Sequence, residues 1–444
     1  MRHASRLPIL LASAVLLAGC STVGGLLKKT PKINVAGDRI AVLVNEAEIE
    51  IDPATAALPM SLPAAVANEA WAQSGGNARK AVGHVALGNA LGVAWTASIG
   101  QGSDKGGRLG GGPVVGEGKV FTMDTQGVVR AFAADSGREL WSARFGEVGE
   151  NRASLYGGGV AYDQGRVYAT NGLGYVAALD ASNGGIHWTV RPGGPLRGEP
   201  SVAADAVYVM SQDNQLYSLK AADGKTNWSN AAALEIAGVS GSAAPAIGQG
   251  TVVAGFSSGE LNAYRYENGR QVWQDALART SISTSVSSLS DIDADPVIDG
   301  GAVYAVGQGG RMVALDLFSG QRIWELNFAG IATPWVAGDW IFAVNDRAQL
   351  IAISRANGKI KWINQLPRWR DVKDKKGPIS YVGPVLAGDR LIVAGSNGAL
   401  INVSPTDGAF QSQVDIKDGI SFQPVVANQT LYLLTDSGRL IAYR

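Results

Sequence analysis

Two short groups of polar side chains are the places where this sequence could hold a metal ion. Asp291 and Asp293 alternate in SLSDIDADPV, and Asp213 stands beside Asn214 in SQDNQ. Carboxylate and amide oxygens are the ligands that calcium prefers. Asp and Asn are also frequent turn residues, because their side chains bond their own backbone. We interpret both pairs as turn residues, since neither belongs to a larger converging set, and we predict no metal site and no cofactor.

The residues needed for nucleophilic catalysis or zinc binding are scarce. The 444 residues include one Cys and three His: His3, His84 and His187. A single Cys excludes an internal disulfide and, with so few His, a Cys/His zinc cluster. His3 lies in the N-terminal targeting segment, and we interpret the other two as structural. The glycines of GQGG (307–310) are turn residues, because no helix follows them as a phosphate-binding loop requires. We therefore predict that the protein is not an enzyme.

The single Cys ends an N-terminal targeting signal. Two Arg residues precede a short apolar run, which is followed by LAGC (17–20). This order is typical of a secretory signal, and the run is too short for a spanning helix. The four residues resemble the bacterial lipobox, in which the Cys is acylated and the signal is removed. We therefore expect a signal peptide at 1–19 and a lipid anchor on Cys20.

A Gly-x-x-x-Trp ending recurs along the rest of the chain. Its six copies are Gly137/Trp141, Gly184/Trp188, Gly224/Trp228, Gly269/Trp273, Gly320/Trp324 and Gly358/Trp362. A seventh copy keeps Gly408 but has Ser412 in the Trp position. The spacing of about 38 to 51 residues is typical of propeller blades. We expect each Trp to pack one blade against its neighbour.

Each repeat contains four short apolar segments bounded by Gly, Asp and Ser, the pattern of β-strands and tight turns. A Pro opens the first segment of seven repeats. The last unit (423–444) has only three segments, and LGVAWTAS (91–98) supplies the fourth with its Trp95. We therefore predict an all-β protein, an eight-bladed β-propeller over 69–444 that an N-terminal strand closes. Residues 20–68 are the expected lipidated Cys, tether and extension, and 38–52 alternates like a strand outside the ring.

The repeat Ala-x-Asp-x-x-Ser-Gly-x-x-x-Trp resembles the blades of quinoprotein dehydrogenases, which hold pyrroloquinoline quinone (PQQ) and calcium at the ring centre. An enzyme of that class in the periplasm is the alternative function. The resemblance also implies a vicinal Cys pair that stacks on the quinone. The single Cys of this chain does not provide that pair.

The lipobox and the eight repeats together resemble the BamB family, the propeller lipoproteins of the outer-membrane β-barrel assembly (BAM) machinery. The resemblance is most specific in PLRGEPSV (195–202) and SLSDIDADPV (288–297). It implies partner-binding residues Leu196, Arg197, Asp291 and Asp293, which dock on POTRA domains of the central barrel subunit. Gly194 stands where the family has a further Leu, so that contact is weakened here.

The same resemblance implies a scaffold at the periplasmic face of the outer membrane, anchored by its lipid. It implies other BAM lipoproteins and unfolded outer-membrane proteins as partners. Ser21, where an Asp would signal retention at the inner membrane, agrees with this location. Lys plus Arg equals Asp plus Glu at 38 each, so the overall charge gives no reason to expect a nucleic-acid partner.

Arg197 and Asp293 each stand three residues before a Pro that opens a repeat. They therefore occupy equivalent blade-to-blade connections, which we expect on one rim of the ring. The long connection 364–383, with Trp369 among basic residues, shares this rim. It is either a solvated loop or a second binding surface. A propeller that binds peptidoglycan or another envelope partner is the third possibility.

Overall fold

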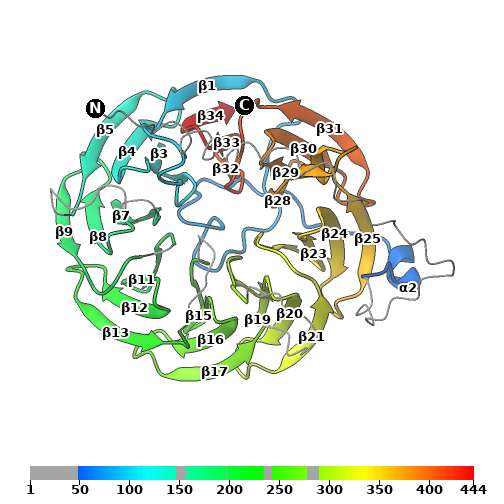
Figure 1. Ribbon diagram of the computed structural model, residues 1–444, viewed down its shortest axis with the longest axis horizontal. Helices are drawn as coiled ribbons and strands as arrows, with labels where there is room; N and C mark the ends of the chain where they lie inside the picture. Colours follow the sequence, from blue (N-terminus) through cyan, green and yellow to red (C-terminus); the bar gives the residue numbers. More distant parts are fainter. Residues whose placement is uncertain (1–48, 147–156, 197, 235–242, 278–289) are drawn as a thin grey trace, which may run out of the picture. The chain divides into compact units, whose positions relative to one another are not determined.

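Eight four-stranded antiparallel sheets form a ring in the computed structural model of the chain (Figure 1). The model describes residues 49–146, 157–196, 198–234, 243–277 and 290–444. In blades 1 to 7 the strand nearest the ring axis comes first in the sequence. An all-β, eight-bladed propeller is therefore confirmed.

The first four blades follow one another along the chain. Blade 1 comprises β2 (Val114–Gly116), β3 (Lys119–Met123), β4 (Val128–Ala133) and β5 (Glu139–Arg144). Blade 2 comprises β6 (Val160–Asp163), β7 (Arg166–Thr170), β8 (Val176–Asp180) and β9 (Ile186–Val190). Blade 3 comprises β10 (Ser201–Ala203), β11 (Ala206–Met210), β12 (Gln215–Lys220) and β13 (Thr226–Ala231). Blade 4 comprises β14 (Ala246–Gly248), β15 (Thr251–Gly255), β16 (Glu260–Arg265) and β17 (Gln271–Ala276).

The remaining blades continue in the same order. Blade 5 comprises β18 (Val297–Asp299), β19 (Ala302–Val306), β20 (Arg311–Asp316) and β21 (Arg322–Asn327). Blade 6 comprises β22 (Trp335–Ala337), β23 (Trp340–Val344), β24 (Gln349–Ser354) and β25 (Ile360–Gln365). The hairpin of β26 (Trp369–Asp371) and β27 (Lys376–Pro378) precedes blade 7, which comprises β28 (Tyr381–Ala387), β29 (Arg390–Gly395), β30 (Ala399–Val403) and β31 (Phe410–Asp415). Blade 8 comprises β32 (Val425–Ala427), β33 (Thr430–Leu434), β34 (Arg439–Tyr443) and β1 (Val93–Ser98).

Strand β1 closes the ring, as predicted. It pairs antiparallel with β34, and Trp95 lies opposite Ala442. Two backbone hydrogen bonds between Gly92 and Arg444, of 2.7 and 3.0 Å, extend the pairing beyond the strand end. The two ends of the propeller thus share one sheet, which leaves neither β34 nor β1 as an isolated edge.

The repeated Trp and Gly join neighbouring blades. Each Trp donates its indole N–H to a carbonyl of the next blade at 2.7–3.1 Å, for example from Trp141 to Ala181. The ring lies over the repeat Gly of that blade, where an added Cβ would lie 2.5–2.8 Å from the preceding Trp. The predicted packing role of the Trp is confirmed.

The closure of the ring explains why blade 7 has Ser412 in the position of the Trp. The surface on which a blade's Trp packs is the turn between the third and fourth strands of the next blade. In blade 8 those strands are β34 and β1, which come from opposite ends of the sequence, so this turn is missing. Ser412 instead bonds Asn402 of its own blade at 2.9 Å.

The opening Pro directly precedes the first strand in six of the seven predicted blades. In blade 7 the prediction was wrong in detail, because Pro384 lies inside β28. The pairing of β28 with β29 shifts register between Val382 and Val385, which accommodates a residue without an N–H in the strand.

Residues preceding the ring pack on its outer side. Ile51 forms a parallel bridge with Ile360 of β25, and the short helix α2 (Pro53–Ala57) follows. The Lys361 ammonium donates to the carbonyl of Ala56 at 3.0 Å. The predicted strand at 38–52 lies outside the described residues up to position 48. No helix in the described part of the chain is both long and apolar enough to cross a membrane.

A segment that we call the central strap, residues 66–88, makes a circuit inside the ring (Figure 1). It reaches all eight blades, each through at least one hydrogen bond: Asn68 on blade 8, Trp71 on blade 1, Ala72 on blade 2, Gln73 on blade 3, Ala78 on blade 4, Arg79 on blade 5, Gly83 on blade 6 and Val85 on blade 7. Trp71 stacks on Trp335 with ring centroids 6.0 Å apart. The ring centre is therefore occupied by the protein's own chain.

Candidate functional site

Two connections between blades carry the residues predicted to bind a partner. We call residues 195–199, before blade 3, the Leu196 loop, and residues 290–295, before blade 5, the Asp293 loop. Both run from the last strand of one blade to the first strand of the next, so they lie on the same rim, as expected. We call this the connection rim. Arg197 lies outside the described residues, as does Cys20.

The Leu196 loop is fixed by its apolar residue. Leu196 is 2% exposed and packs with Val202 and Val209 of blade 3. Its backbone bridges Ser211, and the carbonyl of Pro195 accepts from the N–H of Gln212 at 2.7 Å. In the structure of the chain alone, Leu196 is thus a buried anchor of this loop.

The Asp293 loop is fixed on both sides by backbone contacts. Ile292 N–H donates to the carbonyl of Phe256 at 3.2 Å, and Gln308 N–H donates to the carbonyl of Asp291 at 2.9 Å. The Gln308 amide also donates to the Asp293 carboxylate at 2.5 Å. Asp291 is 1% exposed, whereas Asp293 is partly exposed. Asp293 is therefore the described acidic residue that this loop presents at the surface.

Turns of blades 3 and 4 connect the two loops. The Asn214 side chain accepts from the hydroxyl and N–H of Ser257 at 2.8 and 3.3 Å. The Ser290 hydroxyl of the Asp293 loop donates to the carbonyl of Ser257 at 2.9 Å. Since Leu196 bridges Ser211, a continuous chain of contacts runs from one loop to the other.

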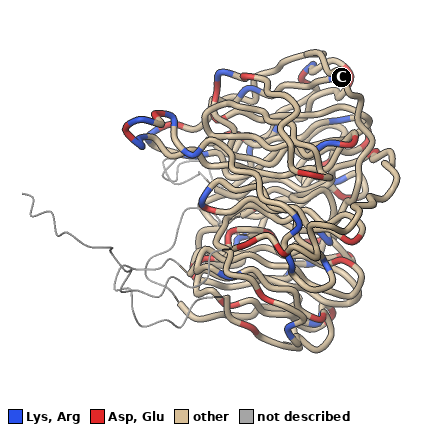
Figure 2. Tube along the Cα trace, turned by 90° about the vertical axis from the view of Figure 1, so that its right-hand side faces the viewer, with Lys and Arg blue, Asp and Glu red and all other residues tan. Residues whose placement is uncertain are grey.

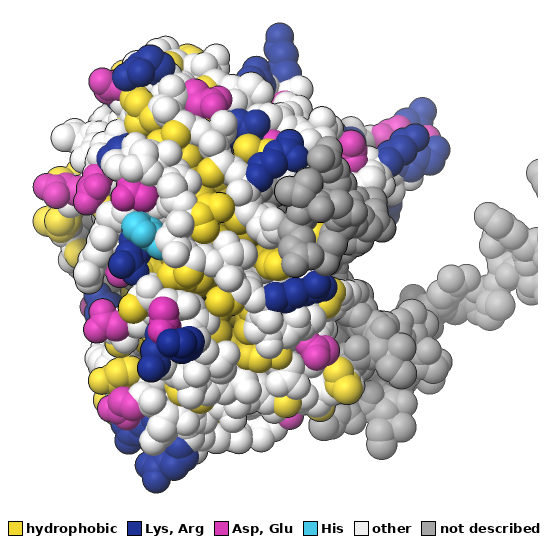
Figure 3. Space-filling view, turned by 90° about the vertical axis from the view of Figure 1, so that its left-hand side faces the viewer, with side chains coloured by type: hydrophobic (Ala, Val, Ile, Leu, Met, Phe, Trp, Pro, Cys, Tyr) yellow, Lys and Arg dark blue, Asp and Glu magenta, His cyan; other side chains and the backbone are white. Residues whose placement is uncertain are grey.

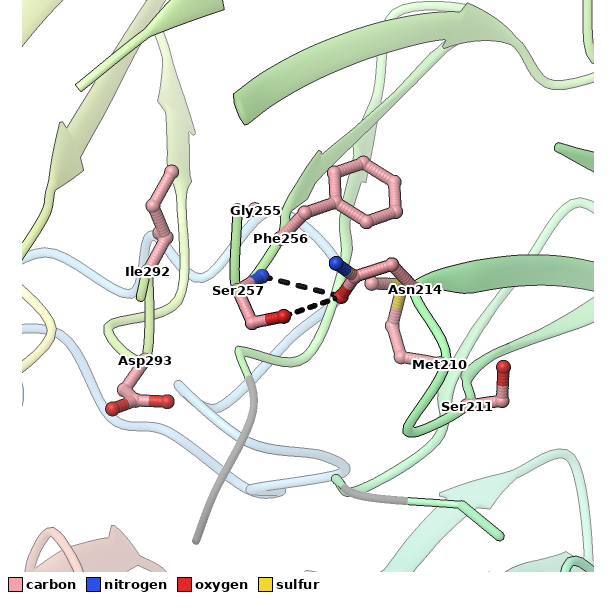
Figure 4. A pocket seen from close by; sticks show the side chains of 8 residues that line it. All are labelled: Met210, Ser211, Asn214, Gly255, Phe256, Ser257, Ile292 and Asp293. Carbon is pink, nitrogen blue, oxygen red and sulfur yellow. Dashed lines mark hydrogen bonds between the residues drawn. The ribbon is translucent and has the colours of Figure 1, made fainter. Parts of the chain in front are cut away.

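A pocket lies along this chain of contacts (Figure 4). Its lining comprises Met210, Ser211, Asn214, Gly255, Phe256, Ser257, Ile292 and Asp293. Met210, Phe256 and Ile292 are buried and form an apolar floor, and Asp293 is at the pocket's edge. These side chains leave no space for a ligand group between them, so the surface offers the partly exposed Asp293 carboxylate, which suits a basic or hydrogen-bonding group of a protein partner.

The acidic and amide pairs of the sequence make hydrogen bonds within and between the turns. The Asn214 oxygen is used by Ser257, and the Asp213 carboxylate accepts from the hydroxyl of Ser211. Nowhere in the described ranges do three or more His, Cys, Asp or Glu side chains gather as metal ligands would. The interpretation of these residues as part of turns agrees with the contacts they make.

A charge cluster at the base of the two loops, in which Lys80 and Asp295 are buried and Glu199 is partly buried, was not predicted. It consists of Lys80 of the strap, Glu199 and Asp295, with the hydroxyls of Ser74 and Ser201. Burial and the nearby Asp295 raise the pKa of Glu199 to about 7, although Lys80 and hydrogen bonds from Gly112 and Ser74 act against this. Burial lowers the pKa of Lys80. Glu199 belongs to the PLRGEPSV motif, but no sequence pattern connects Lys80 with it.

The basic connection 364–383 forms the exposed hairpin β26–β27. Arg368 lies over the Trp369 ring, 5.3 Å from its centroid, and Lys376 pairs with Asp374 at 3.3 Å. One of its basic charges is thus paired within the hairpin, and another lies on an aromatic ring. Figure 2 shows basic and acidic residues interspersed over the ring seen from its edge, and Figure 3 shows apolar and charged side chains intermixed on another side.

Comparison with known proteins gives one consistent family. The family model described as outer membrane protein assembly factor BamB matches residues 81–152 and 125–364. BamB of Escherichia coli K12 is 29% identical over 392 residues, which cover 78% of this chain and 87% of that protein. BamB of Vibrio cholerae is 31% identical over 323 residues, covering 72% and 81%.

Solved structures show the same fold at low sequence identity. BamB from Moraxella catarrhalis aligns with a TM-score of 0.64 and 18% identity, over 80% of this chain and 98% of that chain. Quinohemoprotein alcohol dehydrogenase from Comamonas testosteroni aligns with a TM-score of 0.63 and 13% identity, over 85% and 81%. At these identities, each likeness concerns the fold alone.

Proposed function

This chain belongs to the BamB family of outer membrane protein assembly factors, and from this membership we propose that it is a non-catalytic scaffold of the β-barrel assembly machinery. It binds POTRA domains of the central barrel subunit and aids the insertion of outer-membrane proteins. The observation that carries the proposal is the linked pair of loops on the connection rim. The two family motifs of the sequence contribute to one continuous surface there.

Among the described residues of the proposed docking surface, some support the loops from within and others are exposed to a partner. Leu196 and Asp291 are buried and support their loops, while Asp293 presents a partly exposed carboxylate. Arg197 directly follows the buried Leu196 and is proposed as the second contact. A guanidinium can pair a carboxylate or backbone carbonyls in a fixed geometry, and such residues often dominate the energy of an interface.

The quinoprotein alternative is not favoured. Its enzymes share the fold with this chain at 13% identity. They bind their cofactor at the ring centre, where this chain has its own strap with the Trp71–Trp335 stack. The relatives with the higher identities are named assembly factors.

We also propose that Cys20 carries the lipid anchor and that the ring faces the periplasm. The test is affinity purification of the tagged protein from detergent-solubilised membranes, beside a Cys20→Ala variant. The expected result is recovery of the central barrel subunit with the wild type. The Cys20→Ala protein should remain an uncut precursor at the inner membrane, because acylation precedes cleavage in lipoproteins. A wild type that recovers no assembly subunit would contradict the scaffold, and a normally processed Cys20→Ala protein would contradict the anchor.

A further inference from the structure

The central strap contains a residue held in an unfavourable backbone conformation. Lys80 has φ of +62°, which a residue with a Cβ seldom adopts, and it is 2% exposed. The strap folds tightly around it: a Cβ at Gly75 would lie 2.9 Å from the Cβ of Lys80. The Lys80 ammonium donates to the Ser201 hydroxyl at 3.0 Å, at the start of blade 3. A buried cation in such a conformation persists only where its surroundings determine it strongly.

The carboxylates near Lys80 belong to the ends of the two docking loops. Glu199 follows Arg197 by two residues, and Asp295 follows Asp293 by two residues. The Asp295 carboxylate accepts from the hydroxyl of Ser74 in the strap at 2.6 Å and from the N–H of Ala244 at 2.7 Å. The strap thus contacts the base of the Asp293 loop directly, through a side chain.

The strap is also bonded to the base of the Leu196 loop. The Gln73 amide donates to the carbonyl of Val202 and accepts from its N–H, both at 2.9 Å. Glu199 accepts from the N–H of Gly112, in the connection that precedes blade 1. Both loops therefore end at or just before residues that the same short stretch of strap, residues 73–80, contacts.

From these contacts we infer that the central strap positions the two docking loops relative to each other, with Lys80 as the positioning residue. The inference rests on the proposed function of the loops and adds the element that sets their spacing. Glu199 and Asp295 lie close enough for the charge of Asp295 to act on Glu199, and two such carboxylates repel unless a cation or a proton compensates them. Lys80 provides that cation, so its charge keeps the bases of both loops in one arrangement.

The experiment compares variants of the purified protein in their affinity for the purified POTRA region. Lys80→Met removes the cation and keeps most of the side-chain volume. Arg79→Met is the matched control, because it removes the neighbouring positive charge, which is exposed. The double variant Lys80→Met/Glu199→Gln removes the cation together with one of the carboxylates it compensates. Thermal unfolding of each variant is measured in parallel.

We expect Lys80→Met to weaken binding about tenfold, Arg79→Met to change it less than about twofold, and the double variant to recover most of the loss. The loss of affinity caused by Lys80→Met should be larger at pH 8 than at pH 6. At pH 6 Glu199, which lies near Asp295 and residue 80, is largely protonated, and the neutral carboxyl no longer repels Asp295. Recovery of binding in the double variant distinguishes a positioning role of Lys80 from general damage to the fold.

Hydrogen exchange of the same variants supplies a readout without the partner. In Lys80→Met, backbone amides of the Leu196 and Asp293 loops should lose protection while those of blades 6 and 7 keep it. If Lys80→Met does not fold, Ser74→Ala, which removes only a neutral contact to Asp295, should loosen the Asp293 loop. Unchanged loops and unchanged binding in these variants would overturn the inference. A wild type that does not bind POTRA domains would overturn the proposed function, whereas the exchange result would still decide the role of the strap.

Discussion

At the scale of the residue, each contact between blades is centred on a Trp of one blade and a Gly of the next. The Gly has two functions: its positive φ forms the turn before the fourth strand, and its missing Cβ leaves room for the indole. Both residue types were recognised in the sequence, with the turn role of the Gly and the packing role of the Trp. The spacing of the two residues did not show that the Trp of one blade packs on the Gly of the next, because every repeat contains both residues.

Blade 1 offers a matched pair of glycines to test this. Gly137 has φ of +70° and would place a Cβ 2.5 Å from Trp95, whereas Gly118 has φ of +69° and nothing within 4 Å. Gly118→Ala should cost about 1 kcal/mol of unfolding free energy, for the backbone alone. Gly137→Ala should cost about 1–3 kcal/mol more, because the indole must move. Urea denaturation measures both, and equal losses would show that the Trp contact does not constrain the glycine.

At the scale of the element, the ring depends on one strand from the beginning of the propeller sequence. The three-strand last unit and the displaced Trp95 predicted β1 correctly, because a blade that lacks a strand leaves an unpaired edge. The central strap was not predicted. Its residues show no strand alternation, and its main contacts are hydrogen bonds, mostly of the backbone, to eight blades at other places in the sequence, for which the local composition gives no signal.

Replacing Trp95 with Ala should destabilise the ring about as much as replacing Trp141. Both indoles are buried and donate to a carbonyl of the next blade at 3.1 Å. Loss of a buried Trp costs roughly 3–5 kcal/mol. Chemical denaturation followed by fluorescence and circular dichroism measures the change. If Trp95→Ala were as stable as the wild type while Trp141→Ala was not, β1 would not close the ring in solution.

At the scale of the whole molecule, the ring brings two loops almost 100 residues apart in sequence onto one surface. Their common rim was predictable, because each precedes the opening Pro of a blade by the same number of residues. The burial of Leu196 and Asp291 was not, since it depends on packing against Val209 and on the turns of blades 3 and 4. A sequence motif identifies the residues of such a surface, but it does not show which of them are buried and support the loops and which contact the partner.

The central claim is that this surface binds POTRA domains. The most direct measurement is the affinity of the purified protein for the purified POTRA region, for the wild type, Arg197→Ala and Asp293→Ala. Asp346→Ala is the control, because Asp346 is an exposed Asp in a turn on the same rim, in blade 6. Each of the first two substitutions should weaken binding by about thirty-fold with folding unchanged, as expected for residues that dominate an interface. The control should bind like the wild type. If Arg197→Ala and Asp293→Ala both remain within about twofold of the wild type, the partner binds elsewhere and the claim is wrong.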